Sequence, residues 1–122
     1  MYERENGRFT LKIQHRKVDG DSGLCIHVFG PTASSETEEV LRFDCFNYEP
    51  HYHIAWSYRQ DPFIAIQDRD PFSWSLRKLG NSMNELLRAA DAHEMTPLEL
   101  QLLQENLSLL REAGDRERAK VA

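Results

Sequence analysis

Hydrophobic and polar residues alternate along the first half of the chain, whereas hydrophobic residues recur at helical spacing along the second half. The segment 9–15 alternates strictly, which is typical of a strand buried on one face. Beyond Asp70 the leucines fall three or four residues apart, which is typical of amphipathic helices. The pattern predicts strands within about residues 9–68 and helices over about 71–91 and 97–113.

Asp19 and Gly20 mark the first turn, because the dipeptide Asp-Gly favours a two-residue hairpin. Centring the turn on this dipeptide opposes apolar residues to apolar residues, so turn chemistry and hydrophobic pattern select the same register. The predicted pairs are Leu11 with Val28, Ile13 with Ile26, Lys12 with His27 and Gln14 with Cys25.

A second hairpin follows a polar loop that we expect over residues 30–39. Its strands flank a turn over residues 47–50, and a further short strand is expected over residues 63–67. We choose the register that gathers apolar residues on one face. It pairs Leu41 with Trp56, Phe43 with Ile54, Cys45 with Tyr52 and Asp44 with His53.

The first helix has a clear beginning. Asp70 is a good N-cap residue, and Pro71 after it is favoured at the first helical position. Gly80 lowers helix propensity in the middle of the segment, so we expect a kink or a break there.

The second helix begins with a capping box, because Thr96 and Glu99 have the required spacing. We expect it to end at Gly114, since glycine commonly follows the last helical residue, and we expect the charged tail, residues 115–122, to fray. Its leucines form two stripes, Leu100, Leu103, Leu107 and Leu110 on one side and Leu98, Leu102 and Leu109 on another. A helix that is apolar on two sides must be covered on both, which predicts a homodimer through Leu98, Leu102 and Leu109. The alternative is that both sides are covered within one chain.

These elements predict an α+β fold: one domain over residues 1–122, with two layers, in which an antiparallel sheet of four to five strands is followed by two C-terminal helices packed on one face. The helices are expected to cover an apolar face made by Leu11, Ile13, Ile26, Val28, Phe43, Ile54 and Trp56. The opposite face carries Lys12, His27, Arg42, Asp44, His51 and His53.

Composition restricts the function classes. The net charge of −5 argues against a nucleic-acid partner, because phosphate binding depends on clustered lysine and arginine. No apolar run approaches the roughly 20 residues that span a bilayer, and the charged N-terminus is unlike a signal peptide, so we expect a cytoplasmic protein without a membrane partner. Cys25 and Cys45 are expected on opposite faces of the sheet, which excludes a disulfide between them.

The polar face holds the candidate chemistry. His51 and His53 share one side of a strand, and with Asp44 opposite they are a partial ligand set for a divalent transition metal, the one cofactor that the pattern suggests. His27 is a further imidazole that a suitable strand order brings near. The alternative interpretation is an ordinary exposed sheet face with a cross-strand pair between Asp44 and His53.

Asp44 and His53 are also the candidate catalytic pair, since a carboxylate can hold an imidazole in one tautomer. No nucleophile accompanies them, because Ser57 lies at the far end of the strand. Lys12, His27, Arg42 and His51 are the remaining candidates for ligand contacts on this face. The aromatic residues near the strand ends, Trp56 and Phe63 among them, are expected to pack in the core, and the alternative is that they line a ligand pocket.

The second hairpin resembles that of small uncharacterised bacterial proteins with Arg-x-Asp and Pro-His-x-His elements, some of them encoded beside toxin–antitoxin-like genes. The matching positions are Arg42, Asp44, Pro50, His51 and His53. The resemblance implies a bacterial source and no established activity.

Three function classes follow. The first is a cytoplasmic binding protein, homodimeric, that uses the polar sheet face. The second is a metal-dependent or His/Asp acid–base enzyme, with Asp44, His51 and His53 at its centre and Arg42 steering an anionic ligand. The third is an RNA-processing or toxin-like protein, against which the acidic balance counts.

Overall fold

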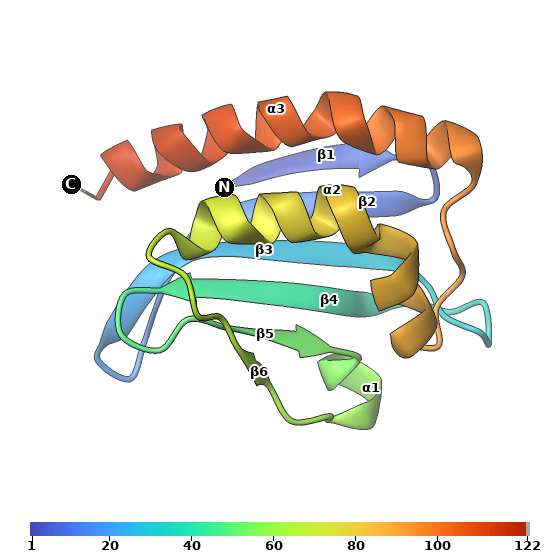
Figure 1. Cartoon of the computed structure of the whole chain (residues 1–122), viewed down its shortest axis with the longest axis horizontal. Coiled ribbons are helices and arrows are strands. Elements are labelled where there is room, and N and C mark those ends of the chain that lie inside the picture. Colours follow the sequence, from blue (N-terminus) through green and yellow to red (C-terminus); the bar gives the residue numbers. More distant parts are fainter. Residues whose placement is uncertain (122) are drawn as a thin grey trace.

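Six antiparallel strands form one sheet in which every strand lies beside its neighbours in sequence, in the order β1-β2-β3-β4-β5-β6 (Figure 1). The computed structural model describes residues 1–121. Strand and helix bounds are β1 Tyr2–Asn6, β2 Phe9–Val18, β3 Asp21–Pro31, β4 Thr37–Phe46, β5 His51–Ile54, α1 Trp56–Arg59, β6 Ile64–Ala65, α2 Pro71–Ala89 and α3 Pro97–Ala119. The α+β class and the antiparallel sheet are as predicted, with six strands in place of four or five.

The β2–β3 hairpin has the predicted register. Asp19 and Gly20 both have positive φ, 49° and 82°, as a two-residue hairpin turn that follows the twist of the strands requires. All four predicted pairs are present, including Ile13 with Ile26 and Lys12 with His27. Local turn chemistry and hydrophobic pattern were sufficient here.

Strand β1 was missed by the sequence analysis. It pairs with β2 and turns Arg4 and Asn6 toward α3. The Arg4 Nε donates to Asn106 Oδ1 at 3.0 Å, and the Asn6 Nδ2 donates to the Glu99 carbonyl at 3.0 Å. Polar contacts with a distant helix hold this strand, so it carries no apolar alternation.

The β4–β5 hairpin corrects the predicted register by two residues. Asp44 lies opposite His51, and His53 lies opposite Arg42. The predicted direct pairing of Asp44 with His53 is therefore wrong, although a shift of two leaves every side chain on its predicted face. The cause lies outside the hairpin: the Asp21 carboxylate accepts backbone N–H groups from Asn47, Tyr48 and Glu49 and draws the turn toward β3.

The fifth strand ends earlier than predicted. Ala55 has a left-handed φ of 59°, which breaks the extended conformation, and the single turn α1 begins at Trp56. Trp56 is 40% exposed, so its predicted place in the core opposite Leu41 is wrong, and Leu41 instead pairs with Ile54. The predicted strand over residues 63–67 is reduced to the two residues of β6.

Both helix starts are as predicted. The Asp70 side chain accepts the Ser73 backbone N–H at 3.1 Å, and Thr96 and Glu99 form a complete capping box. Helix α2 is kinked, but at Ser82 rather than at Gly80.

Helix α3 does not end at Gly114. The glycine lies inside the helix, where a Cβ would meet the Phe72 ring at 2.3 Å, so it allows α2 and α3 to approach closely. The predicted frayed tail is helical as far as Ala119, and Glu117 is buried and paired with the N-terminal ammonium of Met1. Residue 122 lies outside the described residues.

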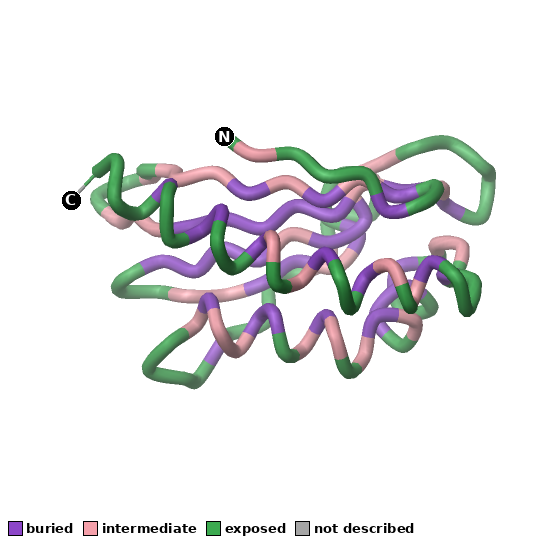
Figure 2. Tube along the Cα trace, turned by 90° about the horizontal axis from the view of Figure 1, so that it is seen from above, coloured by how far each residue is buried: buried purple, intermediate pink, exposed green. Residues whose placement is uncertain are grey.

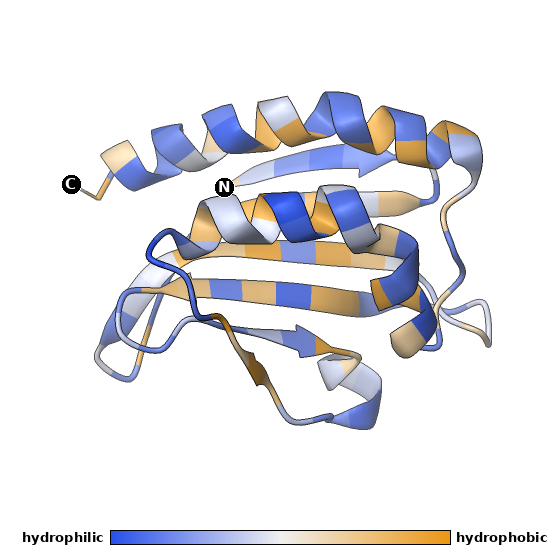
Figure 3. Ribbon diagram, in the orientation of Figure 1, coloured by the Kyte–Doolittle hydropathy of each residue, from blue (hydrophilic) through white to orange (hydrophobic). Residues whose placement is uncertain are grey.

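Helices α2 and α3 cover one face of the sheet and form the second layer (Figure 1). Figure 2 shows the central strands largely buried and both helices alternating between buried and exposed residues. Strand β4 alternates between hydrophobic and hydrophilic residues (Figure 3), with its hydrophobic side chains toward the helices. Within residues 1–121, no helix combines the length and the apolarity needed to cross a membrane.

Glu99 joins the helical layer to the β1–β2 turn. Its carboxylate accepts three hydrogen bonds from Arg8 at 2.8–3.1 Å, one of them from the backbone, and one from the Thr96 backbone at 2.9 Å. Gly7 leaves space for this contact, because a Cβ there would meet Glu99 Oε2 at 2.4 Å. Burial alone would raise the pKa of Glu99, but these hydrogen bonds lower it to about 2.

We therefore expect Glu99→Gln to lower the free energy of unfolding at pH 7 by roughly 1–3 kcal/mol, since charged hydrogen bonds to a buried partner are lost. The folded pKa lies below that of the unfolded chain, so the stabilisation is present above about pH 4.5 and is lost as pH falls toward about 2. Urea unfolding from pH 7 to pH 2 should show the wild type losing more stability than the variant. Glu105→Gln, at an exposed position of α3, controls for the lost charge. Equal pH dependence of wild type and Glu99→Gln would contradict the assignment.

Candidate functional site

The sheet face turned away from α2 and α3, here called the open face, carries two rows of polar side chains. One row runs across β2 to β5 as Lys12, His27, Arg42 and His53. The next row runs as Gln14, Cys25, Asp44 and His51. All six residues predicted for the polar face are on it, because side chains two apart on a strand share a face.

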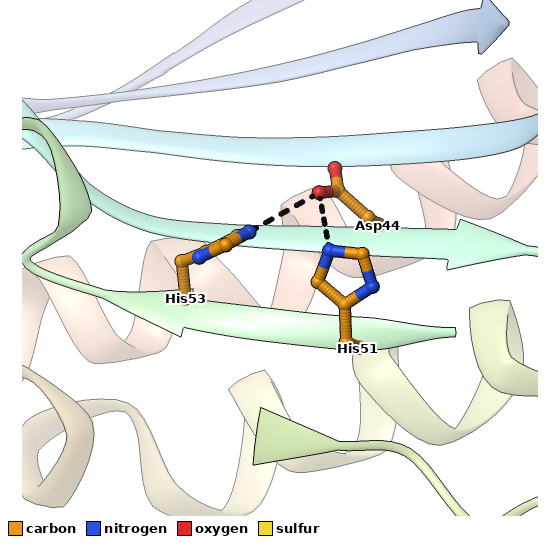
Figure 4. A group of neighbouring side chains, drawn as sticks. All are labelled: Asp44, His51 and His53. Atoms are coloured by element: carbon orange, nitrogen blue, oxygen red, sulfur yellow. Dashed lines mark ion pairs between the residues drawn. The ribbon is translucent and has the colours of Figure 1, made fainter. Parts of the chain in front are cut away.

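Asp44 is the centre of the face and is only 2% exposed. Its Oδ2 lies 3.0 Å from His51 Nε2 and 3.5 Å from His53 Nε2 (Figure 4). His51 reaches it directly across the strand pair and His53 diagonally, so one oxygen lies between two imidazoles. This group of one carboxylate and two imidazoles is called the Asp44 site below.

Two arginines complete the surroundings of Asp44. The Arg42 Nε donates to Oδ2 at 3.3 Å, and an Nη1 of Arg16 donates to Oδ1 at 3.4 Å. Burial alone would raise the pKa of Asp44, but the hydrogen bonds from His51 and His53 and the charge of Arg42 hold it well below its usual range. Asp44 is therefore a carboxylate in the folded protein.

His51 is oriented by the turn that precedes it. Its Nδ1 lies 2.7 Å from the Glu49 carbonyl oxygen, which can only accept, so this nitrogen carries a proton. The other nitrogen, Nε2, faces Asp44. The contact with Asp44 raises the pKa of His51. The turn itself is fixed by Asp21 through the Glu49 backbone N–H at 2.9 Å, so a residue of β3 positions His51.

His53 is buried, and its Nδ1 has no hydrogen-bond partner within residues 1–121. Its ring packs against His51, with centroids 4.9 Å apart, and against Trp56 at 5.3 Å. Phe63 lies 4.7 Å from the His51 ring and 6.3 Å from the His53 ring. On the side away from Asp44 and Arg42, the two imidazoles are thus in contact with aromatic side chains.

His27 belongs to a neighbouring network and not to the Asp44 site. Its Nδ1 lies 2.6 Å from Glu39 Oε2, and its Nε2 lies 3.1 Å from Gln14 Nε2. Arg42 links the two groups, since its Nη1 also reaches Glu39 Oε1 at 3.4 Å. Lys12 lies farther out, 3.8 Å from Glu3 Oε1.

The sequence pattern does not predict several residues of the open face or places them elsewhere. Arg16 continues the polar alternation of β2, which was the available signal. Glu39 was assigned to a loop, but a bulge at Val28 and Phe29 brings it onto the open face. Phe63 and Trp56 were assigned to the core and are instead 58% and 40% exposed.

The cysteines are not part of the chemistry. Both are free and buried, Cys25 beside Asp44 on the open face and Cys45 on the core side, as predicted. Burial raises the pKa of the Cys45 thiol to about 12 and also raises that of Cys25. Neither sulfur is a thiolate near neutral pH.

The donor atoms of Asp44, His51 and His53 lie within 4.8 Å of one another, the arrangement of a site for a metal ion. Acid–base catalysis is less well served, because both nitrogens of His51 are engaged and the unpartnered Nδ1 of His53 is buried. The Ser57 hydroxyl donates to the Glu39 carbonyl at 3.1 Å rather than to a histidine. The geometry therefore favours binding of a cation over activation of a nucleophile.

A cleft of about 980 Å³ opens away from the Asp44 site, between the ends of β2 to β4 and the start of α2. Its charged lining residues include Lys17, Arg69, Arg118, Asp68 and Asp70. Asp70 is used as the cap of α2, and Arg118 lies over the Phe72 ring at 5.6 Å. The charges of the lining are therefore of both signs.

Comparison with known proteins gives a family and no activity. Among curated proteins and solved structures, none matches this chain. The model of a family described as a domain of unknown function, DUF7700, matches residues 4–114, a range that includes all three residues of the Asp44 site. Because the match spans most of the sequence, the chain belongs to the DUF7700 family.

Proposed function

We propose that this chain is a small binding protein whose open face holds a divalent transition metal at the Asp44 site. The observation that carries the proposal is that Asp44, His51 and His53 each offer a donor atom and that these atoms lie within 4.8 Å of one another. Asp44 Oδ2 lies 3.0 Å from His51 Nε2 and 3.5 Å from His53 Nε2. Two imidazoles and one carboxylate suit Zn²⁺, Fe²⁺ or Ni²⁺.

The orientation of His51 supports a cation between the donors. With its Nδ1 protonated toward the Glu49 carbonyl, a neutral His51 turns the lone pair of Nε2 toward a carboxylate. Two lone pairs at 3.0 Å repel, and a positive charge removes the repulsion. A metal ion supplies that charge, and so does a second proton on His51. Donation of the distal nitrogen to a backbone carbonyl is also the usual way in which metal-binding histidines are held.

The donor spacing supports adjacent coordination positions. Donor atoms about 2.1 Å from one ion and at right angles to each other lie about 3 Å apart. The 3.0 Å and 3.5 Å separations from Asp44 Oδ2 are close to this value. Three protein ligands leave positions open for a further ligand, so a metal-dependent enzyme is the second candidate function.

We also propose a homodimer in the cytoplasm. The stripe Leu100, Leu103, Leu107 and Leu110 packs against the core, which leaves the other stripe of α3 for a second subunit. Leu98 is 78% exposed, and Leu102 and Leu109 are half-buried.

If the Asp44 site binds metal, protein purified without chelators should contain about one Zn²⁺, Ni²⁺ or Fe²⁺ per chain by elemental analysis. Chelation should lower the melting temperature by several degrees, because a ligand bound only by the folded state stabilises it by mass action. The double variant His51→Gln/His53→Gln should contain no metal and should not respond to the chelator. His15→Gln, a histidine change on β2 outside the site, should behave as the wild type.

Native protein without metal, whose melting temperature does not change when Zn²⁺, Ni²⁺ or Fe²⁺ is added, would overturn the metal centre. The charge beside Asp44 would then be the second proton of His51.

For the dimer, light scattering at micromolar concentration should report about twice the chain mass. Leu102→Glu/Leu109→Glu should give a folded monomer, because two charges cannot be buried in an apolar interface without large cost. Gln101→Glu, at an exposed neighbouring position of α3, should remain dimeric. A wild type that is monomeric at high concentration would contradict the proposal.

A further inference from the structure

We infer that the metal-loaded Asp44 site takes an aromatic carboxylate as its second ligand. The inference rests on the proposed metal centre and names the class of molecule that would occupy the open coordination positions. Three features of the open face lead to it: the charge balance, the unused arginine donors and the exposed aromatic side chains.

The charge balance requires an anion. The carboxylates of Asp44 and Glu39 are matched by the guanidinium groups of Arg16 and Arg42, with which they form ion pairs. The two positive charges of a bound metal would therefore be uncompensated in a largely buried place. A protein seldom leaves such charge unpaired, since desolvated charge without a partner is costly. A ligand with one negative charge would compensate half of it, and a ligand with two would compensate all of it.

The arginines can bind that anion. Each guanidinium has five N–H donors in a planar fork that matches a carboxylate. The contacts within residues 1–121 use Nη1 of Arg16 and the Nε and Nη1 of Arg42. The remaining donors are accessible, because the Arg16 and Arg42 side chains are 31% and 18% exposed. A carboxylate oxygen on the metal can thus receive N–H groups from beside Asp44.

The aromatic side chains define the other part of the ligand. Phe63 packs on both imidazole rings, Trp56 packs on His53, and both remain substantially exposed. Exposed apolar groups that gather beside polar donors are typical of a ligand site. A flat apolar group next to the carboxylate would cover these rings, which an inorganic anion would leave in water.

The experiment uses the full chain loaded with Co²⁺, whose visible absorption reports its ligands. Titration with benzoate should change the spectrum and saturate. Acetate, which lacks the ring, should bind about tenfold more weakly, the order expected when a ring contact is lost. Benzamide, which has the ring without the charge, should leave the spectrum unchanged.

Variants separate the two parts of the ligand. Arg16→Gln and Arg42→Gln should each weaken benzoate about tenfold, the order of one charge-assisted hydrogen bond. Because they remove a positive charge beside the metal, both should bind Co²⁺ as tightly as the wild type or more tightly. Opposite changes in the two affinities cannot come from unfolding, which would weaken both. Phe63→Ala should reduce benzoate affinity to that of acetate, and Arg77→Gln on α2 should change neither affinity.

The outcomes distinguish the inference from its basis. Failure of the wild type to bind Co²⁺ would overturn the metal centre, and the inference with it. Co²⁺ binding without a response to benzoate would overturn the inference alone. Equal affinity for benzoate and acetate would overturn the aromatic part, and Arg77→Gln acting like Arg42→Gln would overturn the arginine contacts.

Discussion

A buried carboxylate has to be compensated, and on the open face the compensation of Asp44 determines where the other polar groups lie. Two arginines and two histidines approach its oxygens within 3.5 Å. Since an unpaired buried charge costs several kcal/mol, each of these partners offsets part of the cost of burying Asp44. The centre of the open face is therefore buried like a protein core, but ion pairs hold it together instead of apolar contacts.

Residues outside the Asp44 site position the partners of Asp44. The Glu49 carbonyl orients His51, and Asp21 holds the Glu49 backbone from the start of β3. Glu39, aligned by a β-bulge, holds Arg42 on its other side. The arrangement therefore depends on three strands and one turn at once, and not on the His-x-His pair alone. Such support from a surrounding network is typical of sites that hold a bound group in fixed geometry.

The two layers divide the work of the fold. The apolar core lies between the sheet and the helices α2 and α3. Polar contacts such as the ion pair between Glu99 and Arg8 connect α3 to the outer strands. The opposite side is not covered by α2 or α3, and at its β5–β6 edge Trp56 and Phe63 are exposed beside the imidazoles. The DUF7700 family model matches residues of both layers, the sheet and the helices. The open face therefore lies within the matched domain.

Periodicity along the chain predicts the faces of His27, Arg42, Asp44, His51 and His53, together with both helix starts and the Asp19–Gly20 turn. The reason is that these features depend on residues close in sequence: a period of two in strands, a cap three residues from its partner, and a turn of two residues. His51, His53 and Asp44 were therefore assigned to one face without the structure.

Tertiary structure decided everything that depends on distant partners. The β4–β5 register is set by Asp21, 26 residues before Asn47, and strand β1 by contacts with α3 about a hundred residues away. Gly114 could be distinguished from a helix end only by the Phe72 ring packed against it. Arg16 and Glu39 join Asp44 through strand pairing and a bulge. The sequence by itself determined which side chains of the regular strands share the open face, because hydrophobic period assigns faces. The β-bulge that adds Glu39, and the choice of which side chains touch, were decided by contacts between distant segments.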